Sequence, residues 1–234
     1  MSFAASAIAC LVLVAGLLAP ASGHAQAQIS SSPDKLLSDA VAAFKAKDYP
    51  HAITLLQERL RVLMELQGQS SPQAVAAYKD VADVQSNYAN VLSAAGKTVE
   101  ALALFRAVLA ERERRTGGES IDTAISLNRV ALHLEHTGQY GEALPLYQRV
   151  LAIFEKAQGP EHPSTATSLN NLAQLYKAMG HYAEAIALSR RALAITEKVQ
   201  GPEHPATGFI AGNLAALYRS MGLYAEALPL SRRA

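Results

Sequence analysis

The chain has 234 residues, 50% of them hydrophobic, and its 21 Lys and Arg almost balance its 20 Asp and Glu, which leaves a formal charge of +1. Nucleic-acid-binding proteins usually carry a basic excess, so this balance argues against that class of function. The single cysteine, Cys10, excludes a disulfide within the chain and a metal site built from several cysteines.

Residues 1–27 predict a signal peptide. They contain no Lys, Arg, Asp or Glu, and Ala7–Ala19 is an unbroken apolar run, long enough for a signal peptide and short for a membrane span. The small residues of Ala25-Gln26-Ala27 predict cleavage before Gln28 and a periplasmic or secreted protein. Because no Lys or Arg precedes the apolar run, the alternative is an uncleaved segment that anchors the chain in a membrane.

After residue 32, apolar residues at spacings of three and four predict pairs of helices, each pair forming a hairpin. Ser and Pro at the starts of helices, and Gly after their ends, give the expected boundaries. The first four hairpins are predicted over 33–46 with 49–67, 72–95 with 98–115, 120–137 with 140–157, and 163–179 with 182–199; a fifth begins at 205.

These hairpins are repeats of one another. Residues 201–234 are identical to residues 159–192 at 22 of 34 positions, and Gly159 and Gly201 set a 42-residue period. Lys47 stands where later hairpins have a glycine. We therefore predict one repeat domain over 28–234, with units at about 33–67, 68–116, 117–158, 159–200 and 201–234.

The fifth unit, 201–234, is shorter than the 42-residue period and ends inside its second helix. Terminal repeats normally carry a polar outer face, but here Leu228 and Leu230 would have no following helix to cover them. The sequence therefore suggests a fragment of a longer array, or a partner over this end, including a second copy of the chain.

The fourth unit resembles a tetratricopeptide repeat. The resemblance rests on Asn171-Leu172-Ala173, Tyr176, Gly180, Tyr182, Ala185 and Ala192. The 42-residue period, the linker Gly-Pro-Glu-His-Pro and the run Glu142–Tyr147 are similar to the kinesin light chain variety of this repeat, and bacterial exported proteins are the expected setting. The resemblance implies an all-α fold, a right-handed α-solenoid of stacked helix hairpins.

In such arrays the first helix of each hairpin lines a concave groove that binds an extended peptide or a helix. The resemblance implies these peptide-binding positions: Asn87, Asn90, Asn128, Arg129, Asn170, Asn171, Gln174, Lys177, Asn213 and Arg219. Amides offer both donors and acceptors to a peptide backbone, and Lys177 and Arg219 would favour an acidic segment or a terminal carboxylate. Alternatively, the asparagines bond within or between helices and the two cations are simply solvated.

Nothing in the sequence predicts catalysis, a metal or another cofactor. His162 and His204 lie in equivalent linkers, so we expect them to satisfy the starts of the following helices rather than to bind metal. The run Glu111–Arg115 is expected to be a solvated face with pairs inside one helix.

The predicted function is a non-catalytic scaffold or adaptor that binds a peptide or protein segment of unknown identity. Neither nucleic acid nor membrane, apart from the export signal, is an expected partner. The alternative is that the chain is the recognition or regulatory arm of a larger multidomain protein, with catalysis elsewhere; a hidden hydrolase or metal protein is the third interpretation.

Overall fold

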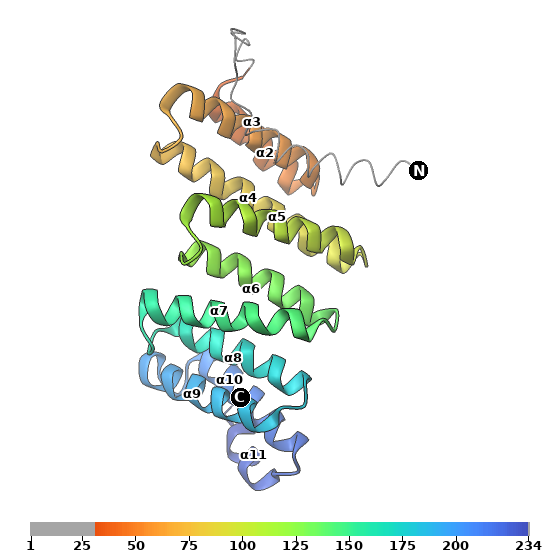
Figure 1. The fold of residues 1–234 in the computed structure, drawn as a ribbon, viewed down its shortest axis with the longest axis vertical. Coiled ribbons are helices and arrows are strands. Elements are labelled where there is room, and N and C mark those ends of the chain that lie inside the picture. Colours follow the sequence, from red (N-terminus) through yellow and green to blue (C-terminus); the bar gives the residue numbers. More distant parts are fainter. Residues whose placement is uncertain (1–30, 234) are drawn as a thin grey trace. The chain divides into compact units, whose positions relative to one another are not determined.

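The computed structural model describes residues 31–233, which fold into ten α-helices and no strand (Figure 1). The prediction of an all-α fold of stacked helix hairpins is confirmed. The predicted signal peptide and its cleavage site lie outside the described residues. Within residues 31–233, no helix has both the length and the apolar character needed to cross a membrane.

The helices begin and end within two residues of the predicted positions wherever both ends were predicted. Their bounds are α2 Pro33–Lys45, α3 Tyr49–Gln67, α4 Pro72–Ala94, α5 Thr98–Thr116, α6 Ile121–His136, α7 Tyr140–Gln158, α8 Pro163–Ala178, α9 Tyr182–Gln200, α10 Pro205–Ser220 and α11 Tyr224–Ser231. The first helix of the second hairpin, α4, has 23 residues against 16 in α6, α8 and α10. The additional residues of α4 account for the longer stretch of sequence between the first two linkers, which begin at Gly68 and Gly117.

The helices form two compact units whose boundary lies within α5, between Val108 and Leu109. The first unit contains α2, α3, α4 and the start of α5. Its core is built from one apolar face of each helix, because those faces recur every three or four residues and meet where the helices pack. The buried members include Leu56, Leu60, Leu63, Tyr78, Val81 and Val108.

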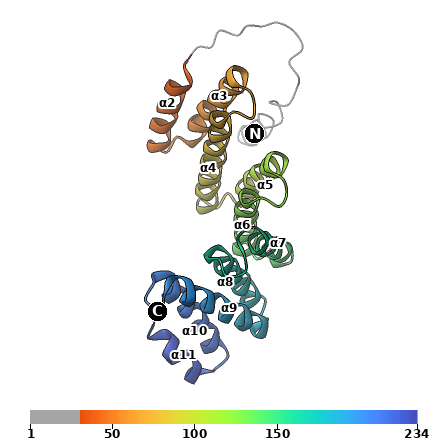
Figure 2. The ribbon, with the colours of Figure 1, turned by 90° about the vertical axis from the view of Figure 1, so that its left-hand side faces the viewer.

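The second unit runs from the end of α5 to α11, and its helices pack in chain order, α6 on α7, α7 on α8, and so on to α11 (Figures 1 and 2). Leu127 of α6 shares a core with Val150 and Ile153 of α7. Leu169 of α8 shares another with residues of α9, α10 and α11. Each hairpin therefore buries its apolar faces against its neighbours, as a repeat array requires.

The prediction that His162 and His204 satisfy helix starts is confirmed. His162 is the residue before α8, and its Nδ1 accepts a hydrogen bond from the backbone N–H of Ser164 at 3.1 Å. His204 does the same for Ala206, also at 3.1 Å. Three other first helices are capped by the hydroxyls of Ser32, Ser71 and Ser120.

Because capping is the only bond of the His162 ring in the described structure, His162→Ala is expected to lower the free energy of unfolding by about 1 kcal/mol. His162→Ser is the matched control, since serine caps three equivalent helices, and it should retain most of the stability. Urea denaturation followed by circular dichroism measures both. Equal losses for the two variants would contradict the capping role.

A buried threonine closes each of the last three linkers. Thr123, Thr165 and Thr207 are 0% exposed, and each donates its hydroxyl to a glycine carbonyl six residues earlier, at 2.7–2.8 Å. The acceptors are Gly117, Gly159 and Gly201. The hydrogen bond ties the end of one hairpin to the start of the next, so the linker has one conformation in all three repeats.

Lys47 occupies the left-handed conformation that glycine adopts elsewhere. Its φ is 62°, while the glycines at the same turn of the later hairpins, Gly96, Gly138, Gly180 and Gly222, have φ between 75° and 80°. A residue with a side chain pays a steric cost in this conformation. The first hairpin therefore keeps the turn of the repeat although it lacks the preferred residue.

Candidate peptide-binding groove

The first helices of the last three hairpins, α6, α8 and α10, carry eight of the ten predicted groove residues. Asn128 and Arg129 lie on α6; Asn170, Asn171, Gln174 and Lys177 on α8; and Asn213 and Arg219 on α10. These three helices belong to the second unit. Asn87, half-buried, and Asn90, exposed, lie on α4 of the first unit.

A pocket of about 220 Å³ opens between α6 and α8. Three of the predicted residues line it, namely Asn128, Arg129 and Asn171. Its other lining residues are Ile125, Phe154, Ser164, Thr167 and Ser168. The pocket therefore combines two apolar side chains with several hydroxyls, two amides and a guanidinium group.

Two amides in this pocket are hydrogen-bonded to each other. Asn171 Nδ2 donates to Asn128 Oδ1 at 3.0 Å, which joins α8 to α6. Each amide has a second polar atom, and these two atoms, Asn128 Nδ2 and Asn171 Oδ1, make no hydrogen bond within residues 31–233. The two pocket-lining amides therefore keep one donor and one acceptor unused, and a peptide backbone also has one of each per residue.

The same arrangement recurs one repeat later. Asn213 Nδ2 of α10 donates to Asn170 Oδ1 of α8 at 3.0 Å. Asn170 is buried, with 4% of its surface exposed, and Asn213 is half-buried. In each pair the two asparagines are 43 residues apart, one residue more than the 42-residue period. Each asparagine therefore bonds to the residue just before its equivalent in the preceding hairpin.

The charged positions at the ends of these helices differ from one hairpin to the next. Glu135 Oε2 of α6 accepts a hydrogen bond from the hydroxyl of Tyr147 at 2.7 Å. Burial first, and then this carboxylate, raise the pKa of Tyr147. Arg219 of α10 donates to Ser231 Oγ at 3.1 Å, so it is partnered and not simply solvated, whereas Lys177 makes no such bond within the described chain.

The apolar residues that line the pocket or lie exposed on the first helices were not among those predicted from the sequence. Ile125 and Phe209, separated by two repeats, are both exposed on first helices, Phe209 by 65%. Phe154 reaches the pocket from α7, a second helix. Ile125, Thr167 and Phe209 are spaced by 42 residues, so the sequence could have shown that they occupy the same position of the repeat. Phe154 lies on a second helix, and only first helices were expected to line the groove.

The run Glu111–Arg115 is partly as predicted. Arg114 and Arg115 bond to Glu111 within α5, at 2.6 and 2.5 Å. Burial works to raise the pKa of the Glu111 carboxyl, but these hydrogen bonds outweigh it and lower that pKa. The expectation of a solvated face is wrong for Arg112, which is 4% exposed and donates to the backbone carbonyl of Asp122 at 3.2 Å.

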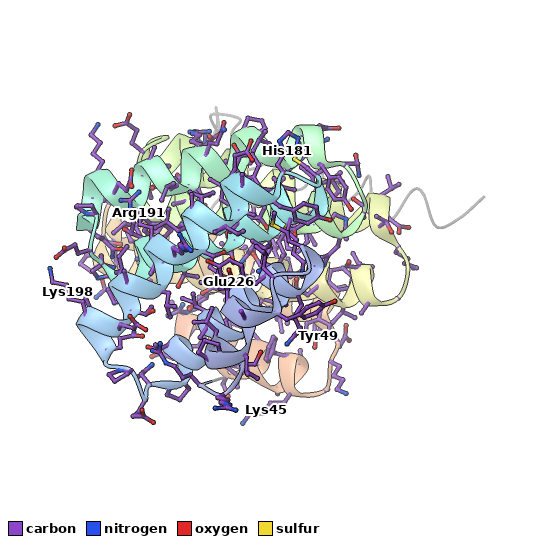
Figure 3. The ribbon with its side chains drawn as sticks, turned by 90° about the horizontal axis from the view of Figure 1, so that it is seen from below. Lys45, Tyr49, His181, Arg191, Lys198 and Glu226 are labelled. Atoms are coloured by element: carbon purple, nitrogen blue, oxygen red, sulfur yellow. The ribbon has the colours of Figure 1, made fainter. Side chains whose placement is uncertain are left out.

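Ion pairs connect successive second helices of this unit. Arg149 of α7 lies 2.6 Å from Glu113 of α5, and Arg191 of α9 lies 2.7 Å from Glu155 of α7. Arg233, which follows the end of α11, pairs with Glu197 of α9. Figure 3 labels His181, the residue before α9, and Lys198, in its last turn. Lys198 pairs with Glu161, and Lys156 with Glu119 one repeat earlier. Because these pairs are largely exposed, each contributes little to the free energy of folding.

Among residues 31–233, no three His, Cys, Asp or Glu side chains gather closely enough to hold a metal ion.

Sequence profiles of the tetratricopeptide repeat match most of the chain. One matches residues 122–198 and 178–234, and a second matches residues 81–122. No curated protein sequence matches the chain significantly.

Solved structures with the same fold include relatives of kinesin light chain. A kinesin-light-chain-like protein of Podosopora anserina, with nearly identical TPR-like repeats, is 26% identical, covers 86% of this chain and 92% of its own, and has a TM-score of 0.59. BtubC (BKLC) from P. vanneervenii has a TM-score of 0.67 at 21% identity, covering 98% of this chain and 87% of its own. RapI without ligand has a TM-score of 0.64 at 18% identity, covering 85% of this chain and 51% of its own.

Proposed function

Because this chain belongs to the tetratricopeptide repeat family, we propose that it is a non-catalytic scaffold that binds a segment of another protein in the groove lined by α6, α8 and α10. Members of this family typically bind proteins, and no catalytic domain is found among the matches. The kinesin-light-chain-like relative supports the same class of function.

The observation that carries the proposal is the pair Asn128 and Asn171 in the wall of a pocket. Their mutual hydrogen bond fixes both amides, so the unused donor and acceptor point from a prearranged site rather than from freely rotating side chains. Because the two amides are already ordered, little binding free energy is spent on ordering protein side chains when a ligand backbone binds there. Ile125 and Phe154 supply apolar contact beside the amides.

The test is binding of the mature chain, residues 28–234, to an array of random 15-residue peptides. Asn171→Ala with Asn213→Ala removes one member of each amide pair, and we expect affinity for the bound peptides to fall about tenfold, since two or more backbone hydrogen bonds are lost. The matched control is Ser220→Ala with Thr54→Ala, two exposed polar positions whose hydroxyls bond to their own helices. Unchanged affinity in the amide variant would overturn the proposed groove.

We also propose that the protein is exported, with cleavage before Gln28. The proposal rests on the uncharged, apolar residues 1–27 and on the small residues of Ala25-Gln26-Ala27. Mass spectrometry of the protein from its native compartment should find an N-terminus at Gln28. An intact N-terminus at Met1 in a membrane fraction would support the membrane-anchored alternative instead.

A further inference from the structure

One flank of α11 is exposed, although the equivalent flank of α9 is covered by the next helix. Tyr224 of α11 is 69% exposed and Leu228 is 54% exposed. Their equivalents one repeat earlier are Tyr182, which is 36% exposed, and Ile186, which is half-buried against the core that α9 shares with α10. Since α11 itself packs on α10 (Figure 2), its flank with Tyr224 and Leu228 is open to a partner.

The covered flank of α9 also holds an arginine that contacts an aromatic ring. Arg190, four residues after Ile186, donates from Nε to the hydroxyl of Tyr218 on α10 at 2.7 Å, and its Cζ lies 5.7 Å from the centre of that ring. Arg232 is the equivalent residue after α11, and its backbone N–H bonds to the Leu228 carbonyl, so it continues the open flank by one turn. The guanidinium group of Arg232 makes no hydrogen bond or ion pair within the described chain. It therefore lacks the aromatic partner that Arg190 has.

The open flank of α11 is complementary to a copy of itself. Tyr224, Leu228 and Arg232 are four residues apart, so they lie along one side of the helix. If two such helices cross antiparallel at Leu228, the two leucines meet, and Tyr224 of each copy lies beside Arg232 of the other. A two-fold axis produces that contact twice. Each contact has the chemistry that Arg190 and Tyr218 already show within the chain, a guanidinium group against a tyrosine ring.

The surface of α2 does not suit this flank, which argues against a head-to-tail chain of copies. In α10, Ile210 and Leu214 are buried in the core shared with α9. Aligning the left-handed turn after α2 with the turn after α10 places Lys35 and Asp39, both exposed, at these two positions. Packing α2 of one copy on α11 of another would take both charged side chains out of water against Leu228, which is costly. The two-fold pairing of α11 with α11 avoids that cost.

We propose that the chain forms a two-fold dimer in which the flank of α11 with Tyr224, Leu228 and Arg232 packs against the same flank of a second copy. The interface is small, because α11 has eight residues, or about two helical turns. Small interfaces give complexes that exchange with their free components, so the dimer forms in proportion to protein concentration. The dimer does not depend on peptide binding, since none of its three residues lines the pocket between α6 and α8.

Sedimentation-velocity centrifugation of residues 28–234, from about 1 to about 300 µM, measures the association. We expect monomer at the lowest concentration, dimer at the highest, and no larger species. Leu228→Asp places two carboxylates together at the two-fold axis and should weaken dimerisation at least about tenfold. Leu66→Asp is the matched control, because Leu66 lies on α3 and is 59% exposed, and this variant should dimerise as wild type does.

Cysteine cross-linking tests the register of the two helices. The only cysteine of the sequence, Cys10, lies outside the tested segment, so each new cysteine is the sole thiol. Under mild oxidation Leu228→Cys should form a disulfide-linked dimer, and a mixture of Tyr224→Cys with Arg232→Cys should cross-link more than either variant alone. The matched control is Glu226→Cys, on the opposite side of α11 by helical spacing and labelled in Figure 3, which should stay unlinked.

Three results would overturn the dimer: monomer at every concentration, a dimer that survives Leu228→Asp, or larger species that grow with concentration. Equal cross-linking through Leu228→Cys and Glu226→Cys would overturn the pairing through this flank. None of these results decides whether the groove binds peptides, because the peptide array measures that binding separately. Failure of the dimer and failure of the proposed function are therefore distinguishable.

Discussion

Replacing Leu169 with alanine is expected to lower the free energy of unfolding by about 2–5 kcal/mol, the usual cost of emptying a well-packed leucine site. Leu169 is 0% exposed and packs in one core with residues of α9 and α10, among them Leu193 and Leu214. The leucine therefore joins two hairpins, and its loss weakens the contact between repeats as well as one helix pair. Alanine is a good helix former, so the loss comes from packing and not from the backbone of α8.

Urea denaturation of residues 28–234, followed by circular dichroism, measures the change. Val199→Ala is the control, because Val199 lies on α9 with 49% of its surface exposed, and its stability should stay within about 0.5 kcal/mol of wild type. A loss of less than about 1 kcal/mol for Leu169→Ala would contradict the packing of α8 against the next hairpin.

Gly159→Ala is expected to cost about 2 kcal/mol, although the new methyl group would touch nothing. Gly159 follows α7 with φ 97° and ψ 159°, a conformation that essentially only glycine adopts. No atom lies within 4 Å of the position that its Cβ would take. Backbone strain is therefore the whole cost, and it would loosen the linker that Thr165 closes through the Gly159 carbonyl.

Gly141→Ala is the matched variant for this effect. Gly141 lies in the first turn of α7, its φ is not positive, and it too has open space at the Cβ position. Alanine favours helix over glycine by up to about 1 kcal/mol, so this variant should be as stable as wild type or more stable. Thermal unfolding compares the two proteins. Equal effects of the two substitutions on the unfolding temperature would contradict the positive-φ conformation of Gly159 in the linker.

The helices were predictable from sequence because their ends depend on local chemistry. Serine or histidine before a proline-rich first turn, and glycine after the last turn, specify a boundary without reference to the rest of the chain. Even the turn at Lys47, where the preferred glycine is missing, could be placed, because the apolar spacing on both sides fixes where the helices must stop. The 42-residue period then transferred each boundary to the next hairpin.

The partners of the groove residues were not predictable to the same degree. Asn128 and Asn171 were expected on the groove, but their hydrogen bond spans 43 residues, and an aligned repeat points to partners one full period apart. Which residue of the preceding first helix an asparagine can reach depends on how the two helices are rotated relative to each other. For the same reason the burial of Arg112 was missed, since a charged run at a helix end normally faces solvent and only the packing of α6 shows otherwise.

Successive hairpins carry different polar side chains at equivalent positions of the repeat. The same crossing between first and second helix holds a Tyr–Glu pair, an unpartnered Lys and Ser, and an Arg–Ser pair in three successive hairpins of the described chain. Each of the three first helices is capped by a side chain, Ser120, His162 or His204, and the same threonine-to-glycine hydrogen bond closes each linker. The polar contacts at the crossing therefore differ from hairpin to hairpin while the linker hydrogen bond stays the same.

The most direct test is to determine which face of the second unit touches a bound peptide. A photoreactive benzophenone amino acid is placed at position 167, where Thr167 lines the pocket, and in a second protein at position 194, where Ala194 is exposed on α9. Each protein is irradiated with peptides that the array selects. We expect a covalent adduct at position 167 and none at position 194; an adduct at position 194 alone would contradict binding in the groove.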